Sequence, residues 1–229
     1  MGVETTVDAA DRKRWYRAGG VAALVLAICY VAIIPLYARA GDPPHGGGEA
    51  RFQYLSGKTT IWWMILGLSV FTDFLFVPVA LALYLALKRV NRNAMLLATA
   101  FVGLFVVLDL AITWTHYASI LTLYREYSIA GDDLQRAGYI AAANYATAML
   151  VCPLEIVYAI VTLSSGILVT GLVMLRSPFG KITAYLGLGT GLLGIASLTG
   201  LSPFIIGNAL FATVWLFFVG HRLWRLTSE

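Results

Sequence analysis

The chain has 229 residues, of which 59% are hydrophobic and only 12% are charged, and its mean hydropathy is +0.79. A water-soluble domain carries about 25% charged residues because its surface faces water, so this composition excludes an ordinary soluble protein. The net charge of +4 does not indicate a nucleic-acid partner, because the basic residues lie in short runs between apolar segments. The sequence therefore predicts an all-α, polytopic membrane helical bundle.

Six apolar segments are long enough to cross a hydrocarbon core, which takes about 20 residues of helix. Lipid offers the backbone no hydrogen-bond partners, so each segment is predicted to be helical. They form a single predicted domain over residues 1–229, with helices at about 19–38, 59–87, 94–124, 139–175 (kinked at Pro153), 182–201 and 204–220.

Lysine and arginine set the expected orientation, because cytoplasmic segments of membrane proteins are enriched in them. These residues gather at both ends of the chain and in the second and fourth connections, at Arg12, Lys13, Arg14, Arg17, Lys88, Arg89, Arg92, Arg176, Lys181, Arg222 and Arg225. The pattern predicts six transmembrane helices with cytoplasmic N and C termini, in a multi-pass protein of the cell inner (plasma) membrane.

The first outer connection, residues 39–58, is predicted to be a flexible loop, because its Gly41–Gly48 stretch is rich in glycine and proline.

Helix packing is expected to be close at Gly187 and Gly191, whose GxxxG spacing lets two helix backbones approach each other.

The segment 139–175 is too long for one simple crossing, since its helix would extend roughly 58 Å. Pro153 divides it, and residues 154–175 can span alone. Residues 139–152 are then either an outer interfacial segment or the protruding top of a kinked helix. Asp132 or Asp133 is expected to cap the start.

Polar side chains within the apolar segments are the candidate functional residues, because an ionisable group in hydrocarbon is costly unless it is paired or hydrated. Counting along each helix places Asp73 and Asp109 about 21–23 Å from the inner boundary and Asn208 about 18 Å from it, so these three can face one another. His116 and Glu155 are expected together at the outer boundary.

Asp109, Thr113 and His116 have helical spacing and share one face, so a polar column is predicted along the third helix with Glu155 at its mouth. Two carboxylates at one depth in a low dielectric do not both ionise readily, which favours proton exchange by Asp73 and Asp109. The alternative is structural: the same groups join neighbouring helices through hydrogen bonds, while His116 and Glu155 are simply hydrated.

Other chemistry has little support. The chain lacks GxSxG, HExxH and P-loop motifs. Haem would ordinarily need two facing intramembrane histidines, and only His116 qualifies. We therefore predict no cofactor, no metal site and no catalytic residue, and an enzyme is not the favoured interpretation.

Three stretches, residues 81–94, 171–182 and 218–226, cover the junctions between helices two and three and between four and five, and the end of helix six. Together they resemble a large bacterial family of six-helix integral membrane proteins catalogued only as a domain of unknown function. The resemblance implies a six-helix architecture and a bacterial inner-membrane location, and it carries over no binding or catalytic residue.

Three functions are kept in order of preference. The first is a carrier for a proton, an ion or a small solute; the second is a non-catalytic subunit or assembly partner of a larger membrane complex; the third is an intramembrane lipid-modifying enzyme. The expected partners are the lipid bilayer and either another membrane protein or further copies of this chain, with no nucleic acid.

Overall fold

The computed structural model of the protein describes residues 2–44 and 46–228, which are helical except at the connections. The α-helices are α1 (Gly2–Ala40), α2 (Gly48–Leu55), α3 (Thr59–Leu87), α4 (Arg92–Leu108), α5 (Thr115–Ile129), α6 (Asp133–Leu150), α7 (Pro153–Ile156), α8 (Thr162–Met174), α9 (Lys181–Ala196) and α10 (Ser202–Arg225). Two π-helical segments, η1 (Asp109–Trp114) and η2 (Val157–Val161), and a 3₁₀ turn, η3 (Ser197–Thr199), continue some of them.

Within the described residues, six helical stretches are long and apolar enough to cross a membrane. They are Asp11–Ala40, Thr59–Leu87, Arg92–Ile129, Pro153–Met174, Lys181–Thr199 and Pro203–Arg225. The prediction of an all-α bundle with six such helices is thus confirmed.

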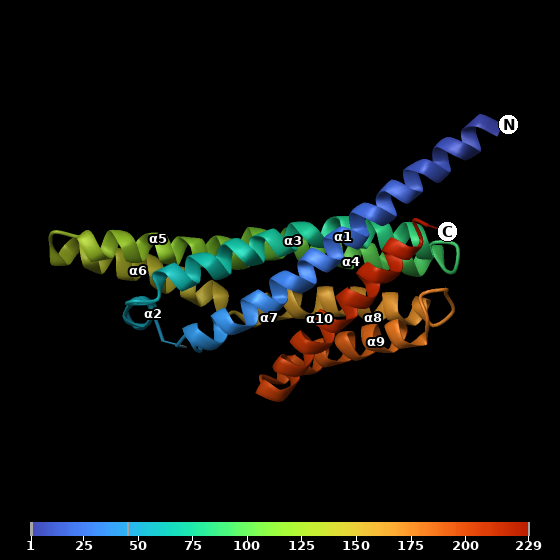
Figure 1. The fold of residues 1–229 in the computed structure, drawn as a ribbon. Helices are drawn as coiled ribbons and strands as arrows, with labels where there is room; N and C mark the ends of the chain where they lie inside the picture. The colour runs from blue at the N-terminus through green and yellow to red at the C-terminus, as the bar shows by residue number, and fades with distance from the viewer. Residues whose placement is uncertain (1, 45, 229) are drawn as a thin grey trace.

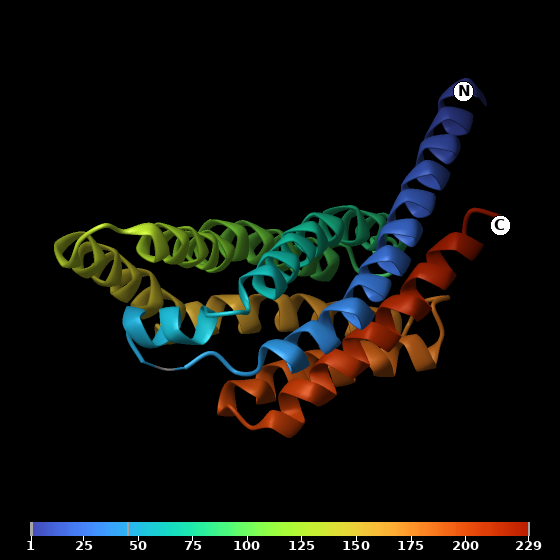
Figure 2. The same cartoon turned by 60° about the vertical axis from the view of Figure 1, so that its left-hand side comes forward.

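The six long helices form a ring in chain order. Helix α1 packs against α3, α3 against α4, α4 against α8, α8 against α9, and α9 against α10, which returns to α1. Both termini lie at one end of the bundle, and the α5–α6 hairpin projects from the opposite end (Figure 1). We call these ends the terminal side and the hairpin side. Figure 2 shows α1 and α10 side by side as they close the ring.

The first connection on the hairpin side contains a helix that the sequence analysis did not predict. Its glycine- and proline-rich part is not helical, but Gly48–Leu55 forms α2. The buried face of α2 carries Phe52 and Leu55 and packs against α6. The Asn144 side-chain oxygen accepts a hydrogen bond of 2.6 Å from the Gly48 amide, so α6 supplies the cap that the α2 sequence lacks.

The predicted kinked helix 139–175 is two separate helices. Helix α6 ends at Leu150 and α7 begins at Pro153, and Val151 and Cys152 interrupt the helical path. Pro153 has no backbone N–H, which explains why a new helix begins there. Helix α6 packs along α5 as a hairpin, and the Asp132 side chain caps it by accepting a 2.8 Å hydrogen bond from the Gln135 amide.

The predicted close packing at the GxxxG glycines is confirmed. A β-carbon added to Gly191 would lie 2.8 Å from the Ser164 carbonyl oxygen and 2.9 Å from Leu168 Cα, both backbone atoms of α8. At Gly187 the nearest backbone atom is Gly171 Cα, at 3.3 Å. Helices α8 and α9 therefore touch through their backbones, and no side chain fits between them at Gly191.

Replacing Gly191 by alanine is expected to separate α8 from α9 and to lower the free energy of unfolding by about 1–3 kcal/mol. The matched control is Gly103→Ala on α4, where an added β-carbon meets nothing within 4 Å. There, alanine's higher helix propensity is expected to raise stability by up to about 1 kcal/mol. Thermal unfolding in detergent compares the two variants, and equal melting temperatures would contradict the packing described here.

Candidate functional site: a buried carboxylate pair

Asp73 and Asp109, the two carboxylates predicted at one depth, lie next to each other. Asp73 is on α3 and Asp109 is the first residue of η1, and their side chains are 4% and 6% exposed. The two carboxyl groups interact directly, and both also lie close to the Trp114 indole. The sequence-based expectation that these two residues face each other agrees with this geometry.

The helix carrying Asp109 changes its winding at this point. Residues Asp109–Trp114 form one π-helical turn, in which residues five apart meet on one face. Accordingly, the Trp114 indole N–H donates a 2.9 Å hydrogen bond to Asp109 Oδ2. A regular α-helix aligns residues three and four apart, so the π turn is what brings Trp114 onto its carboxylate.

Asp73 Oδ2 is buried and has no hydrogen-bond partner among the described residues. A buried carboxylate oxygen without a partner costs free energy, and such orphans need a physical explanation. A proton held between the two carboxyl groups removes one negative charge and supplies the missing hydrogen bond. The pair is therefore chemically suited to bind a single proton.

Glu155 is part of the same region, but it does not accompany His116 as predicted. Its Oε1 accepts a 2.8 Å hydrogen bond from the Thr113 hydroxyl, and Glu155 is 8% exposed rather than hydrated at the boundary. The π-helical segment η2 between Glu155 and α8 changes the winding that was assumed when the depth of Glu155 was counted. His116 Nδ1 lies 2.6 Å from the Ile112 carbonyl oxygen, and its ring faces Tyr145 of α6.

Glu155 adjoins the second π-helical segment, η2, and η1 and η2 contact each other. Two π turns thus meet where Asp109, Thr113 and Glu155 gather. Single π turns inside α-helices occur frequently at functional sites. This coincidence of distorted helices and buried acids singles out the region within the bundle.

Asn208 belongs to a different part of the bundle from the carboxylate pair. Its amide nitrogen donates a 2.8 Å hydrogen bond to the Thr190 carbonyl oxygen of α9. Asn208 and Thr190 both line a large cavity inside the ring. The expected group of Asp73, Asp109 and Asn208 is therefore split between two walls.

Two tyrosines of α1 that the sequence analysis did not single out lie near both the pair and that cavity. Tyr30 interacts electrostatically with both Asp73 and Asp109, and Tyr37 interacts with Asp109 and with Ser69 of α3. Both also line the cavity. They lie seven residues apart, which puts them on one face of α1 and was the available signal.

An aromatic cluster connects the pair with the hairpin side. The Trp62 ring stacks on Tyr117 at 5.0 Å, and Tyr117 lies 5.7 Å from the ring of Trp114. The Trp62 indole N–H donates to the Tyr54 hydroxyl, which in turn donates to the Gly41 carbonyl oxygen. Burial raises the pKa of the Tyr54 hydroxyl, so it stays a neutral donor at physiological pH.

Arg51 of α2 is a buried cation beside this cluster. It is 6% exposed, it interacts with the Tyr117 hydroxyl, and its Nε has no hydrogen-bond partner among the described residues. The sequence contained a signal for it: Arg51 and Leu55 are four residues apart, so Arg51 lies on the apolar stripe of an eight-residue helix.

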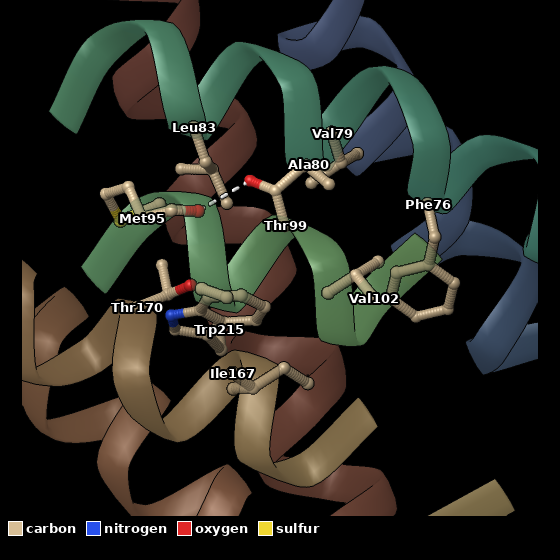
Figure 3. Close-up of a pocket in the computed structure, with 11 residues that line it drawn as sticks. Phe76, Val79, Ala80, Leu83, Met95, Thr99, Val102, Ile167, Thr170 and Trp215 are labelled. Atoms are coloured by element: carbon tan, nitrogen blue, oxygen red, sulfur yellow. Dashed lines mark hydrogen bonds between the residues drawn. The ribbon is translucent and has the colours of Figure 1, made fainter. Parts of the chain in front are cut away.

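Apolar side chains close the terminal side of the pair. Phe76, one turn from Asp73, meets Phe105 edge to face at 5.7 Å between ring centroids. Phe76 also lines a cavity of about 20 Å³, enough for one water at most, together with Val79, Leu83, Met95 and Trp215 (Figure 3). This mainly apolar core, with Thr99 and Thr170 as its polar members, lies between the carboxylates and the terminal side.

The fold and the site define a class: an all-helical protein with six helices suited to span a membrane and acidic residues buried among them. Among the described residues, no three His, Cys, Asp or Glu side chains converge as metal ligands would. Comparisons with protein-family models, curated protein sequences and solved structures find no match. The resemblance to the bacterial six-helix family accordingly stays a prediction.

Proposed function

We propose that the protein is a proton-handling membrane carrier and that Asp73 and Asp109 share the proton it moves. The observation that carries the proposal is the direct contact of two buried carboxyl groups, one oxygen of which has no partner. Ionising both in a low dielectric is unfavourable, so the pair holds one proton and releases it when a path to water opens. The basic residues on the terminal side favour a cytoplasmic location for that side.

The asymmetry of the surroundings supports a carrier rather than an open channel. On the hairpin side, the Tyr37 hydroxyl lies near Asp109, and Trp114, which donates to Asp109, adjoins Tyr117. On the terminal side, Phe76 and Phe105 block it. Transport then requires the apolar core between α3, α4 and α10 to open while the hairpin side closes, as in alternating access.

We expect proton exchange at this site to be measurable when the whole protein lies in a lipid bilayer. The purified chain, reconstituted in liposomes containing a pH-sensitive dye, is expected to let protons enter after an external acid pulse faster than they enter protein-free liposomes. Equal rates with and without protein, in vesicles shown to contain the folded chain, would contradict the proposal and leave the pair a structural link between α3 and η1.

A further inference from the structure

A cavity of about 810 Å³ lies between the ring helices toward the hairpin side and is partly open to the surface. Side chains from α1, α3, α8, α9 and α10 line it, and Gly41 and Asp42 lie at its edge, where α1 ends. Its volume falls in the range of sites for drug-sized molecules, about 300–1,000 Å³. Five of the six ring helices contribute to it, and exposed residues such as Ile206 and Leu210 of α10 line its open side, so the cavity is reached from the outer surface of the bundle.

The chemistry of the lining selects a class of ligand. Aromatic rings of Tyr30, Tyr37, Phe76 and Trp215 face the cavity, and most other lining residues are aliphatic. Ser164, Thr190 and Asn208 add a small polar patch on the opposite wall. Rings attract a positive charge through their faces, so such a lining suits an apolar molecule that carries a cation.

The charged residues in and near the cavity also favour a cationic ligand. None of the described residues lining the cavity is basic, and Asp42 places a carboxylate at its edge. The Asp73–Asp109 pair lies near the lining residues Tyr30 and Tyr37 and carries one further negative charge when it shares a proton. The Lys58 ammonium, near that edge, is already engaged, because it donates a 2.7 Å hydrogen bond to the Ala40 carbonyl oxygen and lies over the Tyr54 ring. A cation is attracted to the carboxylates from the edge of the cavity inward.

We propose that the cavity binds a lipophilic organic monocation, which the rings of Tyr30, Tyr37, Phe76 and Trp215 hold next to the carboxylate pair. The coupling between this ligand and the proton rests on the proposed function, but cation binding itself does not. A cation in the cavity lowers the energy of the fully ionised pair by Coulomb attraction, so binding is expected to release the shared proton. Cation binding and proton binding at the pair would then oppose each other.

The test uses tetraphenylphosphonium, with tetraphenylborate as a probe of the same shape and opposite charge. Equilibrium dialysis against the full chain in lipid nanodiscs is expected to give saturable binding of the cation, with the anion bound at least about tenfold more weakly. Equal binding of the two ions, as simple partition into lipid would give, would overturn the proposal.

Two variants locate the binding. Ala38→Trp places a large ring in the cavity, because Ala38 lines it, and is expected to weaken cation binding at least about tenfold. The control is Ala100→Trp on the exposed face of α4, outside the cavity lining. Asp42→Lys at the edge is expected to weaken cation binding without altering the packed core. Unchanged binding in both Ala38→Trp and Asp42→Lys would refute the site.

The two proposals fail in different ways. Saturable, charge-selective binding in a protein that moves no protons would leave the cavity assignment intact and refute the carrier function. Proton flux without cation binding would leave the carrier function intact and refute the cavity assignment. Release of protons into an unbuffered solution on addition of tetraphenylphosphonium, lost in Asp73→Asn, is the result expected if both hold.

Discussion

Replacing Asp109 by asparagine is expected to lower proton flux in proteoliposomes by a factor of about 100 or more, because the variant loses a group that must bind and release the proton. The asparagine amide keeps the size of the side chain and can still meet the Trp114 indole with its carbonyl oxygen. Neither expression nor thermal stability should therefore fall strongly. Asp73→Asn is expected to have the same effect on flux, since neither carboxyl alone can share a proton.

The control is Asp133→Asn, the same chemical change on a fully exposed carboxylate at the start of α6. Its flux should equal that of the unmodified protein. If Asp109→Asn transported protons as fast as Asp133→Asn, the pair would be a structural contact and the carrier assignment would be wrong.

Replacing Trp62 by alanine is expected to lower the free energy of unfolding by about 3–5 kcal/mol, the usual cost of emptying a large aromatic site. Trp62 is 1% exposed, and its ring stacks on Tyr117 and meets Tyr37 edge to face. It joins α3, α5 and the end of α1 in the hydrophobic cluster on the hairpin side. Its loss should release the α5–α6 hairpin first.

Trp63→Ala provides the comparison, because the neighbouring tryptophan is 46% exposed. Its removal should change the free energy of unfolding by about 0.5 kcal/mol or less. Protease accessibility of the 130–133 turn, with thermal unfolding in detergent, reports both effects. Similar losses in the two variants would show that the cluster on the hairpin side does not depend on Trp62.

Much of the fold could be predicted from the sequence, because lipid imposes simple rules on length and polarity. The second predicted helix, 59–87, matches α3 at both ends, and the glycines at 187 and 191 gave the α8–α9 contact. Helix α2 escaped prediction because its eight residues have no cap of their own and need Asn144 of α6. The α5–α6 hairpin was not predicted because apolar composition alone does not locate a helix break.

For the candidate site, depth counting brought Asp73 and Asp109 together but misplaced their neighbours. Straight-helix geometry assigned His116 to the face of Asp109, whereas the π turn brings Trp114 to that carboxylate instead. The π-helical segment η2 lies between Glu155 and Leu175, so a count with regular α-helical spacing does not give the depth and direction of Glu155 correctly. The two tyrosines of α1 were overlooked because aromatic residues in an apolar helix are usually packing residues, and only the tertiary structure places them beside the acids.

Infrared difference spectroscopy tests most directly whether the pair holds a proton that exchanges with water. We predict that the protein at neutral pH has the C=O stretch of a protonated carboxylic acid, that the band shifts in D₂O, and that it is missing from the Asp73→Asn/Asp109→Asn double variant. A spectrum identical to that of the double variant, or a band that never shifts in D₂O, would contradict the account.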